Sequence, residues 1–162
     1  MKLLILTFLF EPFWCNLHHI STPSSLLPLC FKLSNMATIK LTTDDFIDQI
    51  FDYRNEKEWK YKGSKPAIVD FYADWCGPCR MVAPALEELS EEYADQVNIY
   101  KVDTDKEMEI SAAFGIQSIP SFLFIPMKGL PSMEPGALPK HAFKQIIEEH
   151  LLNPENANNT ES

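Results

Sequence analysis

The chain has 162 residues and a formal net charge of −9, and 46% of its residues are hydrophobic. These fractions are typical of a globular protein and exclude a wholly disordered chain, while the acidic balance argues against nucleic-acid binding, which needs a concentrated positive field. No apolar run reaches the ~18 residues that a membrane-spanning helix requires, and four cysteines are too few for a small domain held together by disulfides.

The first 35 residues differ in character from the rest of the chain. They contain three charged residues and carry a net charge of +1, so residues 36–162 carry −10. Three prolines divide the segment into pieces too short for regular secondary structure. We therefore expect residues 1–35 to be an unstructured extension and Met36 to be the natural start of the protein.

Two other interpretations of this segment stay open. Lys2 and the apolar run 3–10 resemble the beginning of a secretory signal, although Glu11 and Pro12 end the run after eight residues and no small-residue cleavage site follows closely. The segment is alternatively a retained arm. A zinc site is not expected here, because the candidate ligands match no usual metal-binding spacing; these are Cys15, His18, His19 and Cys30.

From residue 36 onward, hydrophobic periodicity predicts alternating strands and helices up to residue 152. The expected elements are a short strand in 36–41, a helix over 43–53 capped by Thr43 or Asp44, a buried strand over 66–73, a helix over 79–93, a strand over 97–103, a helix over 106–114, a buried strand over 121–125, an edge strand over 129–133 and a helix over 137–152. This order predicts an α/β fold, a central mixed β-sheet sandwiched between helices. The polar segment 153–162 is expected to be a disordered tail.

The pattern of the helix over 79–93 assigns its two faces. Apolar residues at spacings of three and four are expected to face the core, and four glutamates, Glu87 among them, are expected to face solvent. Pro84 lies inside this helix and is expected to kink it. Gly115, after the helix over 106–114, is placed where a left-handed C-terminal cap is needed.

The most informative motif is Cys76-Gly77-Pro78-Cys79, between a buried strand and a helix. A cysteine at a helix N-terminus is stabilised as a thiolate by the unpaired backbone N–H groups and the helix dipole. The two-residue spacing also brings the sulfurs close enough to form a disulfide with each other. Zinc is the competing interpretation, but His141 and His150 lie outside the usual ligand spacing. A redox centre without a metal is therefore predicted.

The segment around this motif resembles the active site of the thioredoxins. The matching residues are the segment 69–80, Pro84, the segments 101–103, 114–116 and 118–121, and Gly136. The resemblance covers about residues 36–152 and implies a thioredoxin fold with protein-disulfide reductase activity. It implies Cys76 as the attacking thiol and Cys79 as the resolving thiol.

The same resemblance implies further properties of the protein. Asp70 is expected to be buried beneath the cysteines, and the Ile119–Pro120 bond is expected to be cis. Electrons are expected to come from NADPH through a flavin-containing thioredoxin reductase, with no cofactor bound to the chain itself. The partners are then that reductase and protein disulfide substrates, and the protein is expected to be a monomer. Gly77-Pro78 between the cysteines resembles the reducing thioredoxins rather than oxidases and isomerases.

Three features depart from the usual pattern of the family. Tyr72 stands where many members have tryptophan, which is expected to change fluorescence more than chemistry. The connector 54–65 is longer than usual, and the hairpin 126–131 has extra prolines. Neither of these two segments touches the redox motif, but both can alter the choice of partner.

The residues themselves suggest roles for two charged groups near the cysteines. Asp70 is the only ionisable residue in its apolar strand, and a buried carboxyl group with a raised pKa suits proton exchange with Cys79. Lys101, on a neighbouring strand, is positioned to moderate the charge of Asp70. The alternatives are a structural acid with satisfied hydrogen bonds and a solvated lysine.

A substrate-binding collar is expected around Cys76. A cis bond before Pro120 would expose the backbone of Ile119 for pairing with an extended substrate strand; the alternative is a trans proline that only stops a helix. Trp75 is expected to be part of the collar, with a core tryptophan as the alternative. The collar residues are Trp75, Gly77, Pro78, Ile119, Pro120 and Gly136.

Three functions are consistent with this pattern. The first is a cytoplasmic dithiol reductase that keeps protein thiols reduced. The second is an exported oxidoreductase or isomerase, periplasmic or secreted, if residues 1–35 act as a signal. The third is an interaction subunit of the same fold, which would need neither cysteine nor Asp70.

Overall fold

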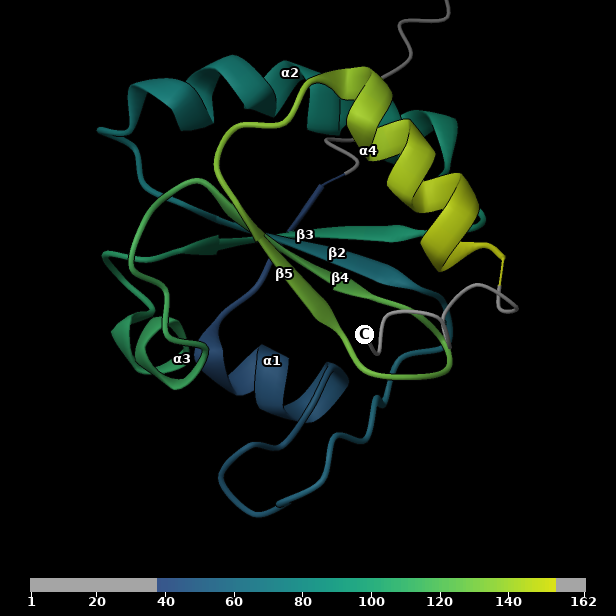
Figure 1. Ribbon diagram of the computed structural model, residues 1–162. Coiled ribbons are helices and arrows are strands. Elements are labelled where there is room, and N and C mark those ends of the chain that lie inside the picture. Colours follow the sequence, from purple (N-terminus) through teal and green to yellow (C-terminus); the bar gives the residue numbers. More distant parts are fainter. Residues whose placement is uncertain (1–37, 154–162) are drawn as a thin grey trace, which may run out of the picture. The chain divides into compact units, whose positions relative to one another are not determined.

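A five-stranded mixed β-sheet organises residues 38–153, which are the residues described by the computed structural model (Figure 1). The strands are β1 (Ile39–Lys40), β2 (Ala67–Tyr72), β3 (Asn98–Asp103), β4 (Ser121–Ile125) and β5 (Ser132–Pro135). Their order in the sheet is β1-β3-β2-β4-β5, with β1 and β2 parallel to β3 and with β4 antiparallel to both β2 and β5. The expectations for residues 1–35 and for the tail after residue 153 lie outside the described residues.

Helices cover both faces of this sheet (Figure 1). Helices α2 (Gly77–Glu92) and α4 (Lys140–Ile146) lie on one face, where α4 continues into a π-helical turn, η1 (Ile147–Leu151). Helices α1 (Thr43–Gln49) and α3 (Met108–Ala113) lie on the other face. The predicted α/β sandwich is confirmed, and its strands β2 and β4 are buried almost throughout, as strands covered on both faces require.

Two hydrophobic clusters separate according to the alternation of side chains along each strand. In β2, Val69 and Phe71 pack with residues of α1 and α3, whereas Ile68 packs with residues of α2 and α4. Asp70 follows Ile68 by two residues, so it points to the face that α2 covers. On β3, Ile99 and then Lys101 point to this same face.

Several boundaries differ from those expected. Helix α1 begins after Thr42 rather than after Thr43 or Asp44, because the Thr42 hydroxyl accepts from the Asp45 N–H while the Asp45 carboxylate accepts from the Thr42 N–H, a capping box. The edge strand lies at Ser132–Pro135 rather than 129–133, since its pairing with β4 fixes Met133 opposite Leu123. Gly115 has φ of +62°, as the expected left-handed cap requires.

Helix α2 is tied to α4 by ion pairs at its surface. Lys140 lies 2.6 Å from Glu88, and Lys144 lies 2.5 Å from Glu92. These pairs are exposed to solvent and contribute little to stability, on the order of 0–1 kcal/mol each.

Among the helices of the described residues, none is both long enough and apolar enough to cross a membrane.

Candidate active site

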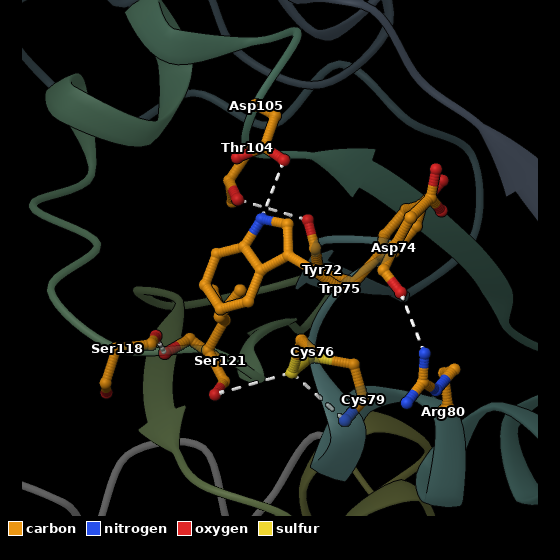
Figure 2. Close-up of a disulfide and its surroundings, with 11 residues drawn as sticks. Tyr72, Asp74, Trp75, Cys76, Cys79, Arg80, Thr104, Asp105, Ser118 and Ser121 are labelled. Atoms are coloured by element: carbon orange, nitrogen blue, oxygen red, sulfur yellow. Dashed lines mark hydrogen bonds between the residues drawn. A yellow bond between two sulfur atoms is a disulfide. The ribbon is translucent and has the colours of Figure 1, made fainter.

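The two cysteines of the motif lie where β2 leads into α2, and they are joined by a disulfide (Figure 2). Their sulfurs are 2.07 Å apart and their Cα atoms 5.3 Å apart. Helix α2 begins at Gly77, two residues earlier than expected, so Cys76 is its N-cap and Pro78 lies in its first turn. Proline is favoured there because its missing N–H would have no partner within the helix.

The N-cap position gives Cys76 a specific electrostatic environment. The backbone N–H of Cys79 donates a hydrogen bond to Cys76 Sγ at 3.1 Å. The positive end of the 16-residue helix α2 points to the same sulfur. When the disulfide is reduced, both features stabilise negative charge on Cys76. The exposed fractions, 3% for Cys76 and 5% for Cys79, do not distinguish the two thiols, so the helix position is what separates them.

The loop that leads into β4 and the turn after β5 lie on the other side of the disulfide. The Ile119–Pro120 bond is cis, as the resemblance implied. Cys76 Sγ lies 3.8 Å from the carbonyl oxygen of Ile119, and the N–H of Gly136 donates to the carbonyl oxygen of Pro120 at 2.8 Å. Gly136 has φ of +97°, which side-chain-bearing residues rarely adopt. The structure therefore brings Ile119, Pro120 and Gly136 together beside Cys76.

Trp75 lies at the surface next to the disulfide, with 68% of the residue exposed. The alternative of a core tryptophan is therefore wrong. Its indole Nε1–H donates to Asp105 Oδ2 at 2.8 Å, and this bond fixes the ring beside the cysteines (Figure 2). Sequence reasoning did not single out Asp105, which follows the end of β3. Its only signal is an acidic side chain at the same edge of the sheet as Cys76.

Asp70 is buried, as expected, with 3% of the residue exposed, and it lies on the face of the sheet that α2 covers. Its Oδ1 atom has no hydrogen-bond partner among the described residues, so the alternative of a fully satisfied structural acid is not supported. Burial raises the pKa of Asp70 to about 7, and the positive charge of Lys101 opposes this increase. With this pKa the carboxyl group is partly protonated at neutral pH.

Lys101 lies on β3 in register with Asp70, and its side chain is only 17% exposed. Its ammonium group lies 5.0 Å from the centre of the Tyr72 ring, within the range of a cation–π interaction. It also lies 4.0 Å from a carboxylate oxygen of Glu87. The alternative of a solvated lysine is therefore wrong.

Glu87 departs from the orientation that its helix pattern predicted. Its side chain is 32% exposed rather than fully solvated, and it lies between the start of β1 and Lys101. The buried residue Thr38 donates to it twice, from its hydroxyl to Oε1 at 2.5 Å and from its backbone N–H to Oε2 at 3.4 Å.

The described residues hold no group of three or more His, Cys, Asp and Glu side chains suited to a metal ion. The geometry instead contains a dithiol–disulfide pair at a helix N-terminus, a buried acid, and an exposed aromatic side chain. A pair of this kind exchanges its disulfide with that of another molecule through a mixed disulfide.

Comparison with known proteins agrees with this chemistry. Residues 37–149 match the sequence profile of the family described as Thioredoxin. The thioredoxin of Borreliella burgdorferi is 52% identical over 111 residues, which are 68% of this chain and 95% of that protein. The chloroplastic M-type thioredoxin of Spinacia oleracea is 33% identical over 134 residues, covering 81% of this chain and 72% of that protein.

A solved structure shares the fold. The crystal structure of chloroplastic thioredoxin z matches with a TM-score of 0.59 and 27% identity, covering 68% of this chain and 91% of that one. The matched family region, residues 37–149, holds all five strands, helices α1 to α4 and the disulfide.

Proposed function

This chain belongs to the thioredoxin family and performs dithiol–disulfide exchange as a protein-disulfide oxidoreductase, and we propose the following roles for its residues. Cys76 is the attacking thiol and Cys79 the resolving thiol. The observation that supports this order is the position of Cys76 as N-cap of α2, where the Cys79 N–H and the helix dipole stabilise its thiolate.

The reaction transfers two electrons in two exchanges. The Cys76 thiolate attacks a substrate disulfide, forming a bond to one substrate sulfur and releasing the other as a thiolate. Cys79 then loses its proton and attacks the sulfur of Cys76. The Cys76–Cys79 disulfide forms, the mixed disulfide breaks, and the second substrate sulfur leaves as a thiolate. The substrate is reduced and the protein is oxidised.

Asp70 is the proton acceptor for Cys79 in this scheme. The support is its burial on the face of the sheet that α2 covers, its unpartnered Oδ1, and a pKa raised by burial to about 7. Such a group accepts a proton at neutral pH and returns it to solvent when the cycle is complete. Lys101, in register beside it, moderates its charge.

The collar binds the substrate chain next to Cys76. Trp75 supplies an exposed aromatic surface and Ile119 supplies backbone groups beside the sulfur. An extended peptide can pair with such a backbone as an added strand, while its cysteine reaches Cys76. The remaining collar residues are Gly77, Pro78, Pro120 and Gly136.

The protein works in the reducing direction as a monomer in the cytoplasm, and a flavin-containing thioredoxin reductase returns it to the dithiol form with electrons from NADPH. The Gly77-Pro78 pair between the cysteines supports this direction.

Reduction of insulin disulfides with NADPH and a bacterial thioredoxin reductase tests the reducing direction. Steady NADPH consumption that depends on the protein is expected, whereas an interaction subunit would give none and an isomerase would rearrange scrambled disulfides faster than it reduces insulin.

The domain that carries the activity is proposed to be residues 36–152. The family match begins at residue 37, and the Borreliella relative is covered almost completely by 111 residues of this chain. A chain that begins at Met36 is expected to keep full insulin-reducing activity and to melt within about 2 °C of the longer chain, because it retains every element of the core. Thermal unfolding and the reductase assay, done side by side on both chains, check this.

The cellular location has its own test. Mass spectrometry of the protein from its own cells reads the mature N-terminus. Met36 or Ala37 at the N-terminus agrees with the cytoplasmic proposal. A cut between residues 15 and 35, with the protein found outside the cytoplasm, would instead establish export.

A further inference from the structure

A line of polar side chains crosses three neighbouring strands on the face of the sheet that α2 covers. Thr38 comes directly before β1, Lys101 lies on β3 and Asp70 on β2, and these strands are adjacent in the order β1-β3-β2. Glu87 reaches down from α2 between Thr38 and Lys101. Hydrogen bonds join Thr38 to Glu87, which are 49 residues apart in the sequence, and an ion pair joins Glu87 to Lys101.

One oxygen of Glu87 connects the two sides of this line. Glu87 Oε1 accepts a hydrogen bond from the Thr38 hydroxyl at 2.5 Å, and the same atom lies 4.0 Å from Lys101 Nζ. The distance to Lys101 is too long for a direct hydrogen bond. Because Thr38 holds Oε1 on its other side, the carboxylate stays at the outer limit of an ion pair with Lys101.

The charge of Lys101 is therefore divided between two carboxyl groups. Asp70 is its neighbour in register on β2, and a carboxylate oxygen of Glu87 lies 4.0 Å from its ammonium nitrogen. The pair of Lys101 with Glu87 is partly buried, at 17% and 32% exposure, so solvent and salt screen it less than a surface pair. Glu87 attracts the ammonium group of Lys101 and adds a negative potential that opposes the positive potential of Lys101 at Asp70.

We propose that Glu87, held in place by Thr38, is a positioning residue that sets the proton affinity of Asp70 by partly neutralising Lys101. The inference rests on the proposed role of Asp70 as proton acceptor and extends the proton-transfer group by two residues. Asp70 must hold its proton weakly enough to be ionised in the resting enzyme and strongly enough to take the proton of Cys79. The field of Lys101 acts in the first direction, and Glu87 limits that field.

The charged and titratable groups around Asp70 come from the strands and from α2, because the residues that α4 and η1 pack against this face, Phe143 and Ile147, are apolar. They are Lys101 on β3, Lys40 on β1 in register with Lys101, Tyr72 on β2, Cys76 at the N-cap of α2, and Cys79 and Glu87 on α2; the neighbour of Asp70 on β4 is the apolar Phe122. Lys40 is exposed and its charge is screened by water. Glu87 is the acidic group of this set that forms an ion pair with Lys101.

The test is a carboxyl-carbon NMR titration of Asp70 in the reduced full-length protein. Glu87→Gln keeps the shape of the side chain and removes its charge, so Lys101 acts on Asp70 in full. The pKa of Asp70 is expected to fall by roughly half a unit or more. The acidic limb of the pH profile for insulin reduction should move to lower pH by the same amount. An Asp70 pKa equal to that of the wild type would overturn the proposal.

Three further variants make the test specific. Glu88→Gln, which removes the neighbouring surface pair with Lys140, is the matched control and should leave the Asp70 titration unchanged. In a Lys101→Met background, Glu87→Gln should shift the pKa of Asp70 by less than it does in the wild type, because Glu87 then has no ammonium group to attract; a full-sized shift there would show that Glu87 does not act through Lys101. Thr38→Val keeps the carboxylate but removes its hydroxyl donor, and a wild-type titration in this variant would overturn the role of Thr38.

The proposed role of Glu87 and the proposed role of Asp70 as proton acceptor can be refuted separately. A shifted pKa in Glu87→Gln with unchanged turnover in Asp70→Asn would support the coupling and overturn Asp70 as the proton acceptor. The opposite result would retain the proton acceptor and reject Glu87.

Discussion

Cys76→Ser is expected to reduce the turnover of protein disulfides to below about one thousandth of the wild-type rate, because the variant lacks the thiol that forms the first mixed disulfide in the proposed scheme. A serine hydroxyl at this N-cap accepts the hydrogen bond that Cys79 N–H now donates to Cys76 Sγ, so the helix start is preserved. Insulin reduction measures the loss, and circular dichroism shows that the fold is kept. Substantial remaining turnover in a folded variant would contradict the assignment of the nucleophile.

Cys79→Ser separates the two steps of the reaction. The variant can still form the mixed disulfide through Cys76, but it cannot resolve it, so complexes with substrates are expected to accumulate. Non-reducing gel electrophoresis followed by mass spectrometry detects these complexes and shows which cysteine is linked. Complexes that form with Cys76→Ser but not with Cys79→Ser would reverse the two roles.

The sequence predicted the redox centre well because its signals are local. The apolar run of β2 and the three-to-four spacing of apolar residues in α2 place the cysteine motif at a strand-to-helix junction. The start of α2 was nonetheless placed two residues late. Gly77-Pro78 resembles a turn, yet a proline in the first turn of a helix costs no hydrogen bond.

The edge strand illustrates a second limit of sequence reasoning. Prolines near residues 126–131 indicated a strand at the sheet edge, and an edge strand is present, but it begins at Ser132. Its position is fixed by the pairing of Met133 with Leu123, and hence by the length of the turn after β4. The order of apolar and polar residues does not show how long the turn after β4 is.

Contacts between distant segments were the part that the sequence did not predict. Asp105 fixes Trp75 across 30 residues of chain, and Thr38 holds Glu87 across 49. Glu87 follows the helical pattern of a solvent-facing residue. Its contacts with Thr38, just before β1, and with Lys101 on β3 hold the side chain against the sheet instead. Such side chains are identified once the sheet order is known, since that order decides which strands α2 covers.

Asp70→Asn is expected to make the protein more stable, and more so at high pH. The folded state raises the pKa of Asp70 from 3.8 to about 7, so between these values the folded protein holds a proton that the unfolded chain releases. Stability therefore falls as pH rises through this window, by about 4 kcal/mol in total. Asparagine has no such penalty, and its advantage should be roughly 2–3 kcal/mol larger at pH 8 than at pH 5.

Denaturant unfolding of the oxidised protein at the two pH values measures this difference, with Asp48→Asn on the exposed side of α1 as the matched control that should show none. The same Asp70→Asn variant should form the mixed disulfide at the normal rate and resolve it more slowly, because Cys79 has lost its proton acceptor. Stopped-flow kinetics separates the two steps. A variant that is less stable at both pH values and resolves the mixed disulfide at the wild-type rate would show that Asp70 is a structural acid. Its carboxyl group would then contribute neither to proton transfer nor to the pH dependence of stability.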